Sequence, residues 1–263
     1  MIIMNKKLSI ITINYNNLEG LKKTVESVVN QTWKAFEYIV IDGGSIDGSK
    51  EYLESQNDNI TYWVSEPDTG IYNAMNKGIA KATGEHLLFL NSGDHFIDML
   101  SLQKVQKQLI NDAVIYFNIN VVENGDSYVL ENPAVMSFTY LHNNLPCHQC
   151  TFIHQSVFDR VGYYDERLKI VADWKLLLLA LLKHNFTYRK VDAIFSTFYK
   201  DGISSLPENQ SIIAAERAQV LETEFPVLLN DLNEYFVQQR IIRNLRKSRK
   251  INWLIKLGLL DKF

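Results

Sequence analysis

The sequence lacks the features that mark several special classes of protein. It has only two cysteines, Cys147 and Cys150 in the segment CHQC, and five prolines among 263 residues. A disulfide framework is therefore not expected. A zinc or redox pair is an alternative for the cysteines, but no second pair exists, and His142 and His154 lack a typical ligand spacing.

Long apolar runs and a strong net charge are also missing. The longest apolar run, from Leu176 to Leu182, falls short of the roughly 18 to 20 residues that cross a bilayer, and it predicts a buried helix. The start, MIIMNKKLSIITINYNN, lacks the layout of a signal peptide, which predicts a cytoplasmic protein. A net charge of −3 argues against a surface built for nucleic acid.

Strand and helix patterns alternate in the first third of the chain. β-Branched runs bounded by turn residues predict strands, and apolar residues three or four apart predict helices. We expect strands at 8–13, 38–41, 60–64 and 86–90, with helices at 18–30, 49–55 and 72–82. This alternation is typical of a parallel sheet in an α/β fold.

The rest of the chain has a mixed pattern, which we expect to pack on the edge of that sheet. The expected elements are a helix at 99–110, strands at 113–122 and 127–130, helices at 150–160 and 174–184, and a strand pair at 186–199. After Pro207 the pattern is helical. The sequence thus predicts a domain at 1–206, with halves at 1–98 and 99–206, and a helical extension at 207–263.

Polar clusters follow each of the four strands predicted to be parallel. They are TINYNN (12–17), DGGSIDGS (42–49), SEPDTG (65–70) and NSGDHF (91–96). Turn preferences explain any one of them, but not the repeated carboxylates at strand ends. Ligands of such sheets bind outside the carboxyl ends of the strands. The fingerprint G-x-G-x-x-G, a Walker A motif and a nucleophile elbow are absent, which disfavours a dehydrogenase or hydrolase.

Four ordered blocks carry a resemblance to a known family. LSIITINYNNLEGLKKTVESVVNQTW, YIVIDGGSIDGS, SEPDTGIYNAMNKGIAKATGEHLLFLNSGD and IVADWKLLLLAL together resemble the family 2 inverting glycosyltransferases of the GT-A fold, over residues 7–205. The resemblance implies an α/β fold, with a mostly parallel nucleotide-binding sheet flanked by helices. It also implies transfer of a sugar from a nucleotide-diphosphate donor.

The resemblance implies a set of donor-binding residues. Asp42 would bind the base or ribose, and Asp68 would close the same pocket. Lys77 would substitute for an arginine that many relatives carry near the position of Met75. The implied set for the nucleotide sugar is Thr12, Asn14, Tyr15, Asp42, Asp68, Lys77, Asn91, Ser92, Gly93 and Asp94.

The segment LNSGD at 90–94 falls where the family has its DxD-type motif, which implies a bound Mg²⁺ or Mn²⁺. Only Asp94 survives as a metal-binding carboxylate, since Asn91 and Gly93 stand where aspartate is frequent. A hard cation also takes oxygen ligands from diphosphate and water, so one protein carboxylate can suffice. The thinned motif keeps open a rival function, a nucleotide-sugar-binding protein without catalysis.

The segment VADW matches the region of the family's general base, which implies that Asp173 removes the proton of the acceptor hydroxyl. The alternative is that Asp173 only caps the following helix. His148 and Gln149 precede this region and would line the acceptor cleft.

The C-terminal segment is basic and amphipathic. No acidic residue interrupts it, and apolar residues including Trp253 recur at near-helical spacing. Its basic residues are Arg240, Arg243, Arg246, Lys247, Arg249, Lys250 and Lys256. The pattern predicts a helix on a membrane surface; packing on the domain or on a second subunit, as in a homodimer, is the alternative.

These features predict a cytoplasmic enzyme that is peripheral at the inner membrane face. It would move a hexose or N-acetylhexosamine with inversion, from a nucleotide-diphosphate sugar such as a UDP-sugar to a glycan or polyprenyl-linked acceptor. Surface polysaccharide synthesis is the expected setting.

Overall fold

The computed structural model describes residues 8–110, 112–200 and 202–262. The first seven residues, which contribute to the prediction of a chain without a signal peptide, lie outside this range. The chain divides into two compact units, one ending at Ile213 and the other starting at Ala214. This division falls within α8 (Gln210–Glu224), shortly after the predicted boundary at 206/207, which stays a prediction.

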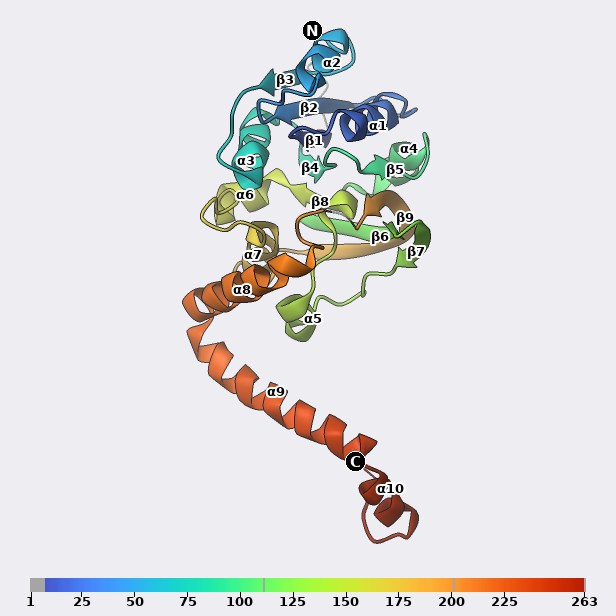
Figure 1. Cartoon of the computed structure of the whole chain (residues 1–263), viewed down its shortest axis with the longest axis vertical. Coiled ribbons are helices and arrows are strands. Elements are labelled where there is room, and N and C mark those ends of the chain that lie inside the picture. Colours follow the sequence, from blue (N-terminus) through green and yellow to red (C-terminus); the bar gives the residue numbers. More distant parts are fainter. Residues whose placement is uncertain (1–7, 111, 201, 263) are drawn as a thin grey trace. The chain divides into compact units, whose positions relative to one another are not determined.

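A nine-stranded sheet forms the body of the first unit, in the order β3-β2-β1-β4-β8-β6-β9-β5, with β7 paired to β6 (Figure 1). Its first four strands are β1 (Leu8–Asn14), β2 (Phe36–Asp42), β3 (Tyr62–Ser65) and β4 (His86–Phe89). All neighbours among them are parallel, so the predicted parallel sheet is confirmed. We call these strands the parallel half; their carboxyl ends lie along one edge.

Helices α1 (Leu18–Val29) and α3 (Ile71–Lys81) cover opposite faces of the parallel half. Successive residues of a strand point to opposite faces of its sheet. Ile10 belongs to the buried apolar cluster to which α1 contributes. Ile11 instead meets α3 at Gly78, where a Cβ atom would lie 2.5 Å from the Ile11 side chain. The missing side chain of Gly78 therefore lets α3 approach β1 closely.

The remaining strands continue the same sheet and form its mixed half. They are β5 (His95–Phe96), β6 (Val114–Glu123), β7 (Asp126–Leu130), β8 (Thr151–His154) and β9 (Tyr188–Tyr199). β8 runs antiparallel to both β4 and β6, and β9 runs parallel to β6 with register shifts around Asn118. As expected, this region joins the edge of the parallel half: β8 pairs directly with the edge strand β4, so the two halves form one continuous sheet.

The structure corrects two predicted elements of the mixed half. The helix expected at 150–160 begins only at Gln155, as α6 (Gln155–Val161), because the residues before it form β8. Their buried pairing between β4 and β6 overrides the helical pattern. The strand pair expected at 186–199 is the single strand β9, which follows β6 through its register shifts without a turn.

The other helical segments of the first unit are short. They are α2 (Ser49–Ser55), α4 (Ser101–Val105) with the 3-10 turn η1 (Gln106–Gln108), α5 (Phe138–Asn143), the 3-10 turn η2 (His148–Cys150), α7 (Ala172–Leu178) with the π-helical turn η3 (Leu179–Lys183), and the 3-10 turn η4 (Pro207–Asn209). Two of them, η2 and α7, carry the residues predicted for the acceptor side.

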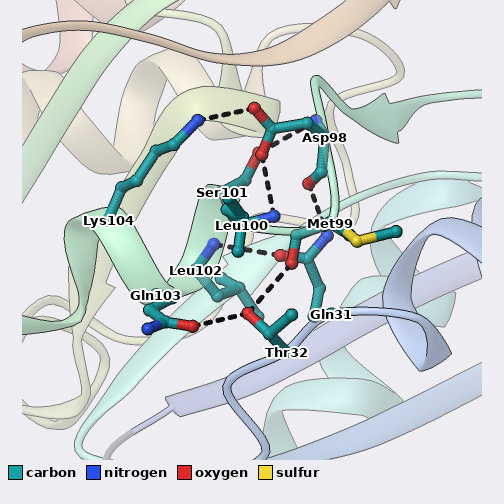
Figure 2. A network of polar contacts seen from close by, with 9 residues as sticks. All are labelled: Gln31, Thr32, Asp98, Met99, Leu100, Ser101, Leu102, Gln103 and Lys104. Atoms are coloured by element: carbon teal, nitrogen blue, oxygen red, sulfur yellow. Dashed lines mark hydrogen bonds and ion pairs between the residues drawn. The ribbon is translucent and has the colours of Figure 1, made fainter.

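Polar contacts around Gln31 tie the end of α1 to the start of α4 (Figure 2). The Gln31 side chain donates to the Asp98 carbonyl (2.8 Å) and accepts from the Leu102 amide (3.0 Å). Lys104 bonds the Asp98 carboxylate (2.6 Å) and holds its pKa below the usual range. These contacts hold the chain around residues 98 and 99 against the end of α1. The sequence predicts the boundary between the halves 1–98 and 99–206 at this position.

The second unit contains α9 (Pro226–Lys247) and α10 (Arg249–Lys256) (Figure 1). Ser248 separates them with an extended backbone, φ −71° and ψ 122°. In the part of the chain that the structure describes, no helix is long and apolar enough to cross a membrane.

Candidate active site

Asn14 joins the loops that follow β1, β2 and β4. Its amide nitrogen donates to Asp42 Oδ1 (2.7 Å) and Ser49 Oγ (3.0 Å), and its oxygen accepts from Ser92 Oγ (2.7 Å). Only 4% of Asn14 is exposed. The loops at this edge therefore meet, as the parallel strand ends require, and Asn14 is a link among them.

Asp42 lies beneath the surface of this edge, with no exposed area. Its carboxylate accepts from Asn14, from Ser65 Oγ (2.6 Å), and from the amide (3.0 Å) and hydroxyl (2.5 Å) of Ser45. Donors from three loops thus converge on one carboxylate. In this structure Asp42 supports the loops that border the edge, whereas the resemblance implied that it faces the base or ribose.

Thr12 is also internal, in contrast to its implied place in the nucleotide pocket. Its hydroxyl contacts the Tyr38 hydroxyl (3.0 Å) and donates to the Leu90 carbonyl (2.7 Å). The residue has no exposed surface. Thr12 therefore fixes the end of β4, from which the loop 91–94 begins.

Tyr15, Gly43 and Asp68 form an accessible part of the edge. A Cβ atom on Gly43 would lie 2.5 Å from Asp68 Oδ2 and 3.2 Å from Tyr15 Cδ2, so the three residues come close together. The Tyr15 side chain is exposed, and Asp68 is partly buried. An exposed ring beside a carboxylate can stack on a base and accept hydrogen bonds from a base N–H or a ribose hydroxyl.

Lys77 contacts the loop between β3 and α3. Its Nζ atom forms an ion pair with Glu66 (2.8 Å) and donates to the Pro67 carbonyl (3.0 Å). The cation expected at the diphosphate is therefore engaged with this loop. Met75, near which relatives carry an arginine, is 1% exposed.

Thr24 of α1 holds the loop 91–94 in place. Its hydroxyl accepts from the Gly93 amide (2.9 Å) and donates to the Asp94 carbonyl (2.7 Å). Gly93 has φ 106°, a conformation that strongly favours glycine. Asp94 is 7% exposed, and Gln149 donates to its Oδ2 atom (2.9 Å). Gln149, predicted at the acceptor cleft, therefore positions the one carboxylate of the loop.

His148 connects this loop to Asp173. Its Nε2 atom lies 3.1 Å from Asn91 Nδ2, and its Nδ1 atom lies 3.8 Å from Asp173 Oδ2. Because an amide nitrogen only donates, Nε2 accepts, and a neutral ring carries its hydrogen on Nδ1, toward the carboxylate. Asn91 Oδ1 is buried and has no hydrogen-bond partner among the described residues. A cation or a ligand hydroxyl would satisfy it.

Asp173 lies in the first turn of α7, and Val171 occupies the N-cap position. Asp173 Oδ1 accepts from the Tyr72 hydroxyl (3.0 Å) and the Trp174 amide (2.8 Å), while Oδ2 faces His148. The side chain is 20% exposed. A carboxylate held in this way and still accessible can take a proton from a hydroxyl group.

Sequence reasoning missed Tyr72 of α3. Its hydroxyl shares one hydrogen between the Ile170 carbonyl (2.5 Å) and Asp173 Oδ1 (3.0 Å). Burial and the charge of Asp173 raise the pKa of Tyr72 well above its ordinary value, so the hydroxyl stays protonated and donates. The sequence offers no signal for this role, because a tyrosine at the start of an apolar helix face is typical of a core residue.

The two cysteines lie beside this site as free thiols. Burial, with smaller contributions from Asp94 and Asp173, raises the pKa of Cys147 to about 12. Burial also raises the pKa of Cys150 well above its ordinary value. Among the described residues, no group of three His, Cys, Asp or Glu side chains could hold a metal ion. The structure gives the zinc or redox alternative no support.

The comparisons with known proteins agree on one family. The profile described as Glycosyl transferase family 2 matches residues 9–162. An uncharacterized glycosyltransferase of Mycobacterium tuberculosis strain H37Rv is 35% identical over 180 residues, which cover 66% of this chain and 69% of the relative. A PGL/p-HBAD biosynthesis glycosyltransferase of Mycobacterium bovis BCG is 29% identical over 177 residues, covering 63% and 66% of the two chains.

Solved structures share the fold at low identity. Staphylococcus aureus TarS 1–349 in complex with UDP-GlcNAc gives a TM-score of 0.65 at 19% identity, covering 82% of this chain and 66% of that one. The mannosyltransferase PcManGT of Pyrobaculum calidifontis, in complex with GDP-Man and Mn²⁺, gives 0.58 at 12% identity, covering 94% and 82%. These likenesses confirm the predicted α/β fold.

Proposed function

Because the chain belongs to glycosyl transferase family 2, and is a glycosyltransferase, we propose that it moves a hexose or N-acetylhexosamine from a UDP-sugar to a glycan, with inversion. The acceptor oxygen bonds to the anomeric carbon as the bond from that carbon to the diphosphate breaks. The acceptor proton passes to a protein base, and UDP leaves. Family membership favours this reaction over binding of a nucleotide sugar without catalysis.

The edge at Tyr15, Gly43 and Asp68 is the proposed binding place of the nucleotide. Its exposed ring and carboxylate suit a base and a ribose, and the solved TarS complex holds UDP-GlcNAc in a related fold. Asn14, Asp42 and Thr12 lie beneath this binding place, and their hydrogen bonds would fix the loops that surround it. Lys77, through Glu66 and Pro67, would hold the loop 65–70 against the donor.

Asp94 is the proposed ligand of Mg²⁺ or Mn²⁺. The loop 91–94 fits such an ion, because it offers one carboxylate and the buried, unpartnered oxygen Asn91 Oδ1, and hard cations prefer oxygen ligands. When bound, the cation would neutralise charge on the departing diphosphate. Gln149 orients the Asp94 carboxylate, and Thr24 fixes the turn that carries it.

Asp173 is the proposed general base. One observation carries this assignment: His148 bridges the Asp173 carboxylate and Asn91 in the donor-side loop, so a base and the loop lie on either side of one imidazole. Tyr72 and the Trp174 amide fix Asp173 Oδ1, and the accessible carboxylate would receive the acceptor proton. His148 would then border both the donor and the acceptor, and the buried Gln149 would act through Asp94.

The test is Asp173→Asn, which keeps the shape of the side chain but removes its basicity. We expect kcat to fall by about 1,000-fold, within the range known for general bases, while UDP affinity changes by less than about twofold. Asp159→Asn, a change at an exposed carboxylate on α6, is the matched control and should leave both values unchanged. Full turnover by Asp173→Asn would remove Asp173 from this role.

The acceptor is proposed to be a glycan or a polyprenyl-linked glycan in surface polysaccharide synthesis. An enzyme that works on a lipid-linked acceptor would be peripheral at the inner face of the membrane. Turnover of a panel of UDP-sugars with lipid-linked and soluble acceptors tests this assignment directly. A strict preference for a soluble acceptor would contradict it.

A further inference from the structure

The C-terminal helix α10 exposes most of its side chains. Ser248 caps it, with its hydroxyl accepting from the Ile251 amide (3.5 Å), and Gly258 at φ 70° follows its end. The structure describes all eight residues of α10, and none of them is buried. Short helices without a buried face gain little stability from packing, so a surface that covers α10 would stabilise it.

One face of α10 combines cations with an aromatic ring. Residues three, four, seven or eight apart share a helix face. By this spacing Arg249, Trp253, Lys256 and Leu257 lie together, and Lys250 borders them. Trp253 is 61% exposed and Leu257 is 53% exposed. We call these five residues the basic aromatic face.

The surroundings of this face are apolar and basic. A shallow groove of about 530 Å³ is lined by Arg249, Lys250, Trp253 and Leu254. The chain continues into the exposed residues Leu259 and Leu260. No acidic residue lies between Arg240 and Leu260 in the sequence, so the positive charge of the segment is not balanced locally along the chain.

We propose that the basic aromatic face binds the surface of a lipid bilayer that contains anionic phospholipids. The cations would contact lipid phosphates, the Trp253 ring would lie at headgroup level, and the neighbouring leucines would enter the acyl boundary. A nucleic acid would match the charge but leave the leucines in water. A second copy of this chain that paired through the same face would place cations against cations. The charge and the apolar groups together therefore favour a bilayer.

This inference rests on the proposed function for its purpose, since it would bring the enzyme to a lipid-linked acceptor. Binding itself is independent of catalysis. The two proposals can therefore fail separately when vesicle binding and sugar transfer are measured on the same protein.

The experiment measures sedimentation of the full chain with phosphatidylcholine vesicles, with and without about one third phosphatidylglycerol. We expect binding only to the anionic vesicles, and a decrease with added salt. Arg249→Glu with Lys250→Glu should weaken binding by at least about 25-fold, because each cation near an anionic surface contributes about fivefold. Trp253→Ser with Leu257→Ser should weaken it by at least about tenfold.

Lys50→Glu with Lys107→Glu is the matched control, because it makes the same change in net charge at exposed lysines of the sheet unit. Its binding should stay within about twofold of the unaltered chain. All variants should transfer sugar normally to a soluble acceptor without vesicles. Loss of transfer in the unaltered chain, with vesicle binding intact, would count against the proposed function alone.

Three results would overturn the proposal. One is equal binding to neutral and anionic vesicles, and another is unchanged binding by both double variants. The third is that the variants abolish dimerisation or nucleic-acid binding while vesicle binding is absent from the start. Quenching of tryptophan fluorescence by brominated lipids gives a second measurement, and it should be lost in Trp253→Ser.

Discussion

The parallel and mixed halves of the sheet assemble their polar residues by different means. In the parallel half, Asn14, Asp42 and Ser65 come from the ends of neighbouring strands, and Asn14 and Ser65 each donate directly to Asp42. In the mixed half, His148 comes from a 3-10 turn and Asp173 from the first turn of a helix. Topology brings the first group together, whereas side-chain packing brings the second group together.

The contacts that serve the fold can thus be separated from those that remain available. At the parallel edge, the Asp42 carboxylate is buried and surrounded by hydrogen-bond donors of the protein. In the mixed half, Asp173 keeps one oxygen toward His148, and its side chain is partly exposed. We therefore expect substitutions in the buried hydrogen-bond network of Asp42 to affect stability first. Substitutions around Asp173 should affect turnover first.

Asp42→Ala should have the largest effect and tests the first half of this contrast. It leaves the donors of Asn14, Ser45 and Ser65 without their acceptor, so we expect a loss of about 3–5 kcal/mol in the free energy of unfolding. Urea denaturation measures it. Asp173→Asn should cost less than about 1 kcal/mol, and an equal loss in both variants would erase the contrast.

His148→Ala should lower kcat by about 10- to 100-fold with little change in the KM for the donor, because the variant loses the group that faces Asp173 Oδ2. His148→Gln keeps a donor there and should recover part of the rate. Steady-state kinetics measures the decrease in kcat. The melting temperature of the variant is the control, because it separates a catalytic effect from misfolding. A raised acceptor KM with unchanged kcat would instead indicate acceptor binding alone.

Gly43→Ala should weaken UDP binding by about tenfold, because the new methyl group would displace Asp68 and Tyr15 from their positions. The neighbours that must move are the ends of accessible side chains, so the free energy of unfolding should change by less than about 1 kcal/mol. Calorimetric titration with UDP tests the prediction. Unchanged affinity would place the nucleotide elsewhere.

Asp165→Asn should have the smallest effect and probes the stability of the mixed half. Arg167 and Lys175, each 2.8 Å away, hold the pKa of Asp165 well below its usual range. A depressed folded-state pKa stabilises the fold above about pH 4 and loses this effect as the pH falls further. The variant should cost about 1 kcal/mol at pH 7, since Arg167 is largely exposed.

Unfolding in urea at neutral and acidic pH checks both the size and the sign of the contribution of Asp165 to the free energy of unfolding. The difference between the variant and the unaltered chain should shrink as the pH is lowered below about 4. A difference that grows on acidification would show that Asp165 is not the stabilised carboxylate.

Strand periodicity was sufficient to predict the parallel half, because β-branched runs and turn residues report local structure. It was less reliable at Thr151–His154, where pairing with β4 and β6 decided the conformation against a helical pattern. The sequence predicts two strands at 186–199, whereas pairing with β6 through register shifts makes the single strand β9. These errors share one cause, which is that the decisive contacts are distant in the sequence.

The candidate site likewise has features that the sequence predicts and features that depend on contacts distant in the sequence. The family resemblance points to Asp94 and Asp173 as carboxylates of interest. It cannot show that His148 lies between Asp173 and Asn91, since 24 residues stand between the histidine and that aspartate in the sequence. Nor could it show that Lys77 is engaged by Glu66. The sequence also does not show which of these residues are buried. Thr12 and Asp42 look like ligand-binding residues in the sequence, and the fold encloses both.

Tyr72 and the Trp174 amide both donate to one oxygen of Asp173, the proposed general base. This arrangement has a consequence for the geometry of transfer. A carboxylate clamped at one oxygen cannot pivot to meet hydroxyl groups arriving from different directions. Selection among the hydroxyls of a sugar ring would then be imposed by a rigid scaffold, and linkage fidelity would follow from the stiffness of two helices meeting at a single carboxyl group.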